Sequence, residues 1–202
     1  MNSDPKNITT SSSEDISLVQ AFCNGEKEAF DRLVLKYKDK VFNLCYRFSG
    51  NREDADDCAQ EAFIKVYRSL TRFRQESSFS TWLYTITSNT CKNKLASIRY
   101  KEGKIAIRLD KPVSTEEGSV TREIKGHFPD PKRELERKEK GAIIQEAIDT
   151  LPQDQKTVVV LRDIEGLSYE EIAEVTGHAI GTVKSKLSRA RDVLRMRLKG
   201  LI

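Results

Sequence analysis

Polar and basic residues near the carboxyl end of the chain have the types and spacing needed to bind duplex DNA. On a helical wheel that starts at Val183, the outward positions are Thr182, Ser185, Ser188, Arg189 and Asp192, and the positions beside the apolar stripe are Lys184, Lys186 and Arg191. The outward set can read base edges, and the flanking cations can hold phosphates. Residues 182–200 contain seven basic side chains and one acid, so the positive charge is concentrated there.

A helix-turn-helix would position these side chains. Ser168 and Glu171 have the spacing of a capping box for a first helix. Gly177 suits the positive backbone angle of a sharp turn, and a second helix from near Ile180 would bury an apolar stripe that begins at Val183. A basic surface helix in an ordinary helical hairpin is the alternative. Cap, turn and charge together favour the DNA-binding motif.

A second group of residues mixes aromatic rings with cations and amides. It comprises Arg72, Phe73, Arg74, Phe79, Trp82, Tyr84, Asn89, Lys92, Asn93 and Lys94. Rings beside cations suit unpaired bases. Core packing is the stronger interpretation for Phe79 and Trp82. Asn89 and Asn93, one helical turn apart, are harder to explain as core residues.

A third group is acidic and comprises Glu53, Asp54, Asp56, Asp57 and Glu61, with Gln60 beside them. Such a surface fits a basic partner. Acids in the first turn of a helix also complement the helix dipole, which accounts for Glu53 and Asp54 better than for Asp57 and Glu61. These residues alone do not favour a partner-binding surface over a role in complementing the helix dipole.

Composition limits the class of protein. The chain has 202 residues, of which 33% are charged and 38% hydrophobic, with a net charge of +4. No apolar run is long enough to insert into a membrane, and the first residues lack the layout of a secretion signal, so a cytoplasmic protein is expected. The scattered cysteines Cys23, Cys45, Cys58 and Cys91 and only two histidines argue against a metal site, a disulfide or another cofactor.

The chain divides by pattern into four parts and is expected to be all-α. Residues 1–13 are polar and predict a disordered tail. Residues 14–100 show helical periodicity without a hairpin signal. Residues 101–134 hold three of the five prolines and predict a flexible linker. Residues 135–202 resume the helical pattern and end in the helix-turn-helix.

Residues 57–67 (DCAQEAFIKVY), 79–86 (FSTWLYTI) and 89–93 (NTCKN), followed by the helix-turn-helix, closely resemble the bacterial extracytoplasmic-function sigma factors of the sigma-70 family. The resemblance implies a sigma2-like domain and a sigma4-like domain that read the promoter -10 and -35 elements. It implies core RNA polymerase and promoter DNA as partners, and an anti-sigma factor as a further one. It also implies a protein that is not an enzyme by itself.

The resemblance assigns roles to individual residues. Core polymerase would bind Asp54, Asp57, Gln60, Glu61 and Phe63. The -10 element, with one base flipped out, would bind Phe73, Arg74, Trp82, Asn89, Lys92 and Asn93, and Lys94 and Arg99 would hold its backbone. The -35 element would bind Thr182, Lys184, Ser185, Lys186, Ser188 and Arg189. Family members often have arginine where this chain has Lys184 and Lys186, so Arg189 is the preferred base reader.

Two other classes of protein share part of this pattern. A transcriptional activator of the response-regulator or quorum-sensing type would have a similar helix-turn-helix, but it leaves the first hundred residues unexplained, since no alternation of strands and helices is visible there. A sigma-like protein that binds polymerase or an inhibitor without starting transcription would match both halves.

Overall fold

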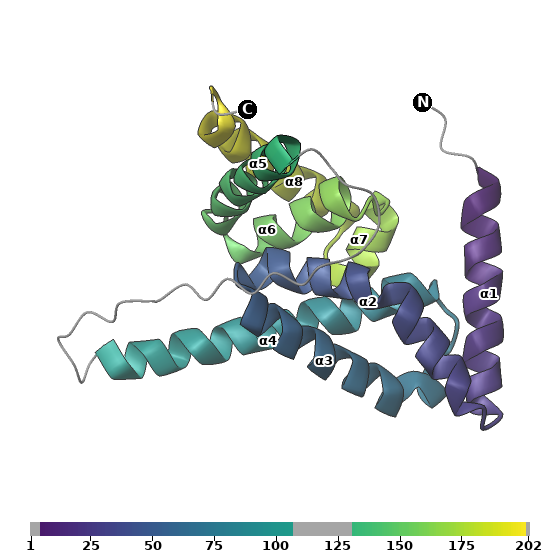
Figure 1. The fold of residues 1–202 in the computed structure, drawn as a ribbon. Coiled ribbons are helices and arrows are strands. Elements are labelled where there is room, and N and C mark those ends of the chain that lie inside the picture. The colour runs from purple at the N-terminus through teal and green to yellow at the C-terminus, as the bar shows by residue number, and fades with distance from the viewer. Residues whose placement is uncertain (1–4, 107–130, 201–202) are drawn as a thin grey trace.

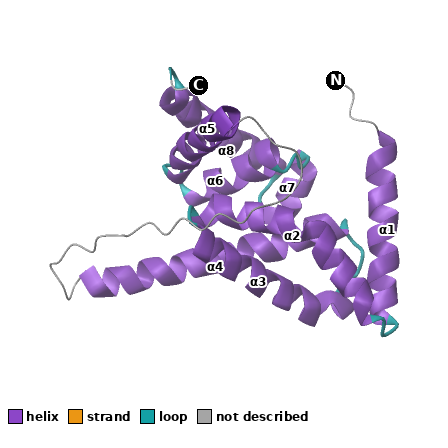
Figure 2. Ribbon diagram, in the orientation of Figure 1, coloured by secondary structure: helices purple, strands orange, loops and turns teal. Residues whose placement is uncertain are grey.

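The computed structural model describes residues 5–106 and 131–200, and all the regular elements in those ranges are helical (Figure 1, Figure 2). In chain order they are α1 (Pro5–Cys23), α2 (Lys27–Ser49), α3 (Arg52–Ser69), the short 3-10 turn η1 (Leu70–Arg72), α4 (Phe79–Ala106), α5 (Pro131–Asp149), α6 (Gln153–Val159), the π-helical turn η2 (Val160–Ile164), α7 (Tyr169–Thr176) and α8 (Ile180–Leu198). The all-α prediction is confirmed. Within the described ranges, no helix is both long and apolar enough to cross a bilayer.

The amino-terminal unit is a bundle in which α2, α3 and α4 pack around fully buried side chains that include Leu44, Phe48 and Leu83. Helix α2 ends at Gly50, which takes the left-handed φ of 79° that glycine accommodates best. Asn51 then caps α3, because its side-chain oxygen accepts from the backbone N–H of Asp54 at 2.8 Å. The abrupt change of direction between α2 and α3 therefore has a local cause.

Helix α1 lies against this bundle through one buried carboxylate. Asp15 is buried and accepts from the hydroxyl of Tyr37 at 2.6 Å and from Nζ of Lys36 at 2.7 Å. Because a buried charge is tolerated only when it is paired, these two bonds fix where α1 meets α2.

The structure differs from the predicted boundaries at three helix ends. Helix α1 begins at Pro5, inside the expected tail, and α4 runs to Ala106, inside the expected linker. Helix α5 begins at Pro131, where proline at the first helical position needs no partner for an N–H. Proline and glycine content predicted a linker but did not locate the ends of the helices beside it. Residues 107–130 of the predicted linker and residues 1–4 of the predicted tail lie outside the described ranges.

The carboxyl-terminal unit places the helix-turn-helix on a support of α5 and α6. The predicted helix over residues 153–164 is present, but its last turn widens into the π-helical turn η2. Val158, Val160 and Leu161 are fully buried there. Helix α8 packs on both α6 and α7.

The two units, expected to be joined only by a flexible linker, lie in contact along a seam (Figure 1). Helix α7 packs on the first turns of α4, and α5 meets the end of α2. Lys156, only 6% exposed, donates to the backbone oxygen of Phe48 at 3.4 Å and to Asp149 at 2.6 Å. Gly50 lies so close to this point that a Cβ there would come within 3.0 Å of Oδ2 of Asp149. One continuous core therefore runs through both units.

Candidate nucleic-acid interface

Helix α8 presents the predicted base-reading side chains to solvent. The capping box at the start of α7 is complete: Oγ of Ser168 accepts from the backbone N–H of Glu171 at 3.1 Å, and the Glu171 carboxylate accepts from the Ser168 N–H at 2.8 Å. Gly177 ends α7 with a φ of 69°. Both features confirm the predicted turn.

The apolar stripe of α8 is buried at Val183, Leu187 and Ala190. The opposite face is exposed, and it carries Thr182, Lys184, Ser185, Ser188 and Arg189. Four of these are outward positions that the helical wheel assigned to base contacts, and Lys184 is a flanking position that it assigned to phosphate.

The flanking cations of α8 differ in whether they form ion pairs within the protein. Lys186 donates to Asp154 at 2.6 Å, and this bond, with the charge of Lys186, holds the pKa of Asp154 below its usual value. Arg191 forms an ion pair and a hydrogen bond with Asp163. Lys184 lies 5.4 Å from the ring centroid of Tyr169 and makes no ion pair among the described residues. We therefore rank Lys184 above Lys186 as a phosphate contact, an ordering that the sequence did not give.

Helix α4 carries the second candidate nucleic-acid surface. Trp82, Asn89 and Asn93 fall on one stripe of this helix, because their spacings of seven and four residues return close to the same angle. Asn89 and Asn93 are exposed, and neither side chain has a hydrogen-bond partner among the described residues. Lys92 is half-buried beside them. The stripe offers two free amides about 10 to 17 Å along the helix from Trp82.

An aromatic cluster forms the amino-terminal end of that stripe. The ring of Phe73 lies 5.0 Å from that of Trp82 and 6.1 Å from that of Phe79, measured between centroids. Phe79 is buried, whereas Phe73 and Trp82 are half-buried. Phe79 is thus a core residue, as the packing interpretation had it, and it supports two rings that remain accessible.

The loop between η1 and α4 leaves its cation exposed. Arg74 makes only a loose ion pair, 3.9 Å from Glu76, and its side chain is 82% exposed. Gln75 has a positive φ of 60°, which turns the loop sharply beside the aromatic cluster. Ser78 then caps α4, accepting from the N–H of Thr81 at 3.1 Å.

The acidic residues of α3 form a ridge beside α4 in which several acids are already paired. Lys94 of α4 lies 3.0 Å from carboxylate oxygens of both Asp54 and Asp57, and Lys65 lies 2.6 Å from Glu61. Hydrogen bonds from Asn51 and then from Lys94 hold the pKa of Asp54 below its usual value.

Within this ridge Asp57, Gln60 and Glu61 remain exposed. Phe63 is half-buried and packs against the core. Lys94, which the resemblance assigns to the DNA backbone, joins α3 to α4 in this structure.

Sequence reasoning missed the residues of the seam. Tyr84 donates to Glu165 at 3.1 Å, Thr81 lies 3.5 Å from Glu171, and Arg47 donates to Gln145 at 3.0 Å. These partners are separated by 81 to 98 positions in the chain and share no periodic pattern. Only a three-dimensional arrangement could have found them.

Comparison with protein families assigns both units. The family described as Sigma-70 region 2 matches residues 33–99, and the family described as Sigma-70, region 4 matches residues 141–194. The RNA polymerase sigma-H factor of Pseudomonas aeruginosa is 40% identical over 94% of this chain and 96% of its own length. The chain belongs to the sigma-70 family of RNA polymerase sigma factors.

Further relatives place it among the extracytoplasmic-function members. The ECF RNA polymerase sigma-E factor of Haemophilus influenzae is 38% identical over 93% of this chain and 97% of its own length. The sigma-E factor of Escherichia coli strain K12 is 36% identical over 93% of this chain and 96% of its own. The activator alternative is not favoured, since region 2 accounts for the amino-terminal unit that it left unexplained.

Solved structures share the fold. The structure of CnrH with the cytosolic domain of CnrY superposes with a TM-score of 0.64, at 22% identity over 92% of this chain and 97% of that one. The sigma factor RpoE of Bartonella quintana, solved with the anti-sigma factor NepR, superposes with a TM-score of 0.62. It is 26% identical, and the match covers 85% of this chain and 97% of that one.

Proposed function

We propose that this sigma factor recognises promoters through two surfaces, the exposed face of α8 for the -35 element and the stripe of α4 for the -10 element. The observation that carries the proposal is the free polar face of each helix. On α8, Arg189 offers a planar fork for guanine, and Ser185 and Ser188 flank it. On α4, Asn89 and Asn93 offer unpaired amides beside accessible rings, which suits a base removed from the stack.

Core RNA polymerase binds, in this proposal, to the exposed part of the α3 ridge. Asp57, Gln60 and Glu61 lie on one face of α3 and favour a basic helical partner. Asp54 supports this surface through its ion pair with Lys94, and Phe63 supports it by packing against the core beneath the ridge. The protein acts in the cytoplasm with the polymerase, and it is not an enzyme by itself because the polymerase supplies the chemistry.

Reading both elements at once requires the two units to separate. The elements lie about 25 base pairs apart, or roughly 85 Å along B-form DNA at 3.4 Å per step. In the structure α7 touches α4 directly. We call the arrangement in which α7 packs on α4 the closed form. It is therefore a state of the protein that is not bound to a promoter. An anti-sigma factor, the kind of partner with which the Bartonella quintana relative was solved, is the expected inhibitor.

Run-off transcription with purified core polymerase on genomic promoter fragments tests this function. Discrete transcripts are expected only when the protein is present. The matched variant replaces Gln60 and Glu61, both exposed and outside the core, with lysine. It should fold normally and give no transcripts because it no longer binds polymerase. Promoter binding without any transcripts from the unaltered protein would instead identify a sigma-like protein that does not initiate.

A further inference from the structure

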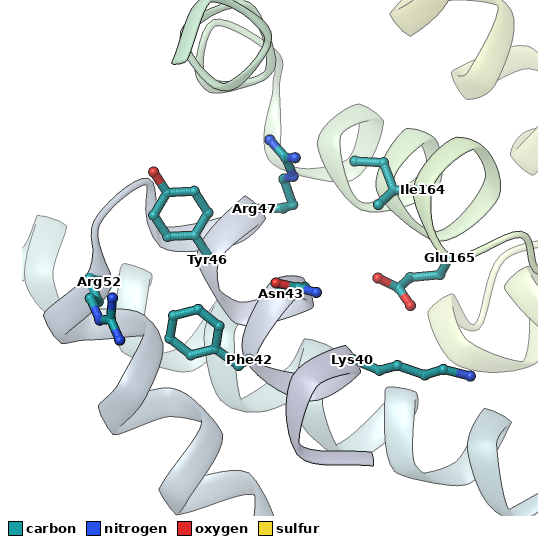
Figure 3. Close-up of a pocket in the computed structure, with 8 residues that line it drawn as sticks. All are labelled: Lys40, Phe42, Asn43, Tyr46, Arg47, Arg52, Ile164 and Glu165. Carbon is teal, nitrogen blue, oxygen red and sulfur yellow. The ribbon is translucent and has the colours of Figure 1, made fainter. Parts of the chain in front are cut away.

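A cavity of about 740 Å³ opens at the seam and is lined by both units (Figure 3). Its walls come from α2, from the first residue of α3 and from the end of η2, and they comprise Lys40, Phe42, Asn43, Tyr46, Arg47, Arg52, Ile164 and Glu165. None of these residues belongs to the DNA or polymerase surfaces proposed above. The volume falls within the usual range for small-molecule sites, about 300 to 1,000 Å³.

The cavity carries an excess of positive charge. Lys40, Arg47 and Arg52 face it, with Glu165 as the one acid in its lining. Within the described ranges, Lys40 and Arg47 have no carboxylate within 4 Å, and Arg52 has only a long contact of 3.8 Å with Asp56. Three cations against one carboxylate give the lining a net positive charge, which favours an anionic ligand, and arginine forks suit phosphate.

Aromatic rings line one side of the cavity. The rings of Phe42 and Tyr46 are nearly parallel, at 20° with centroids 6.4 Å apart, and both are half-buried. The guanidinium of Arg52 lies over the Phe42 ring at 5.9 Å. Figure 3 shows the two rings on one side, Ile164 and Glu165 on the other, and Asn43 and Arg47 between them. A flat ring system could pack on this wall while its anionic group reaches the cations.

Glu165 narrows the choice of ligand further. Its carboxylate accepts from the Tyr84 hydroxyl at 3.1 Å and retains further acceptor capacity toward the cavity. A ligand that fills the site must therefore offer donors as well as negative charge. A bare anion lacks such donors, and an acidic peptide would set its carboxylates against Glu165.

We propose that this cavity binds a nucleoside phosphate. The base packs on Phe42 and Tyr46, the phosphates lie on Arg47, Arg52 and Lys40, and the sugar hydroxyls or base amines meet Asn43 and Glu165. The ligand is either a free nucleotide or a nucleotide within an unpaired strand. Because both units line the site, the bound ligand favours the closed form and opposes the separation that promoter reading requires. The binding site itself does not depend on the promoter proposal.

Fluorescence anisotropy with a labelled ATP analogue tests the proposal on the full-length chain. Saturable binding with a dissociation constant below about 1 mM is expected. Unlabelled ATP, inorganic phosphate and a five-residue thymidine oligonucleotide serve as competitors. ATP as the best competitor identifies a free nucleotide as the ligand, and the oligonucleotide as the best competitor identifies an unpaired strand.

Variants locate the site. Lys40→Gln with Arg52→Gln should weaken binding at least about tenfold, because each removes a charge-assisted contact. Lys27→Gln with Lys38→Gln is the matched control, since both lysines are exposed on α2 outside the cavity. Tyr46→Ala should weaken ATP more than inorganic phosphate. Arg47 is left unaltered because it also holds Gln145.

Four results would overturn the proposal. The first is the absence of saturable binding, and the second is equal binding by the cavity variant and its control. The third is loss of binding in Arg189→Ala instead, which would place the nucleotide on the recognition helix. Displacement of the probe by an acidic peptide but not by ATP would indicate that the ligand of the cavity is an acidic protein segment and not a nucleotide.

Discussion

The hydroxyl of Tyr84 on α4 donates a 3.1 Å hydrogen bond to the carboxylate of Glu165, which follows the π-helical turn of the other unit. The bond crosses the seam at α4, the helix that carries the proposed -10 surface. Burial raises the pKa of Glu165, although the Tyr84 hydroxyl and the nearby cations Lys40 and Arg47 oppose that rise. The seam therefore contains a carboxyl group that gains a proton more readily in the closed form than in water.

We predict that closure is favoured by mild acid. With its pKa raised, Glu165 contributes stability that is complete below the ordinary value of 4.5 and is lost as the pH rises through the raised value. Small-angle X-ray scattering should give a smaller radius of gyration at pH 5 than at pH 8. Glu165→Gln keeps an oxygen acceptor for Tyr84 and does not titrate, so it should abolish this difference. A pH response that survives in Glu165→Gln would assign closure to another group.

Arg189→Ala should weaken binding to a -35 duplex by roughly 1–3 kcal/mol and relax preference at one base pair. The exposed guanidinium of Arg189 lies on the free face of α8. Arg195→Ala is the matched control because it removes the same charge from the same helix, where the side chain pairs with Asp192. Anisotropy titrations over single-base promoter variants measure both effects. A uniform loss across all variants would reassign Arg189 to phosphate.

Asn89→Ala should impair promoter opening more than duplex binding. Its amide is exposed and unpaired among the described residues, so its loss removes about 0.5–1.5 kcal/mol of contact to a flipped base without disturbing the bundle. Permanganate reactivity of -10 thymines reports opening, and -35 duplex affinity reports the other surface. Asn24→Ala, an exposed asparagine in the turn after α1, is the control. Equal losses in both assays would contradict the assignment.

Lys94→Met should lower the free energy of unfolding by about 1 kcal/mol at pH 7, since it removes a partly exposed cation shared by Asp54 and Asp57. The lowered pKa of Asp54 means that its contribution is present above the ordinary value of 3.8 and is lost as the pH falls through the lowered value. Urea unfolding at pH 7 and in acid measures the difference, which should shrink in acid. Lys38→Met, an exposed lysine of α2, should be neutral.

Local chemistry made part of this structure predictable. Ser168, Glu171 and Gly177 encode the helix-turn-helix within ten residues, and the period of Val183 and Leu187 fixes which face of α8 is free. Asn89 and Asn93 stood out because unpaired amides at helical spacing have no packing explanation.

The rest depended on partners distant in the chain. Lys186 carries no sign in the sequence that it pairs with Asp154, and Lys156 gives no hint that it donates to Phe48. The residues that make polar contacts of this kind do not recur at a regular spacing in the sequence. A single lysine also looks the same in the sequence whether it binds phosphate or a neighbouring helix. The closed seam and its cavity are invisible to pattern analysis for that reason.

Gly50 lies at a point where a substitution would alter the contact between the two units. Its φ of 79° disfavours any side chain, and an added methyl group would press on Asp149, which Lys156 and Gln145 hold in place. A side chain at this position is expected to push the two units apart. A substitution at Gly50 should therefore shift the balance toward the separated form while leaving the proposed DNA-contacting side chains of α4 and α8 unchanged.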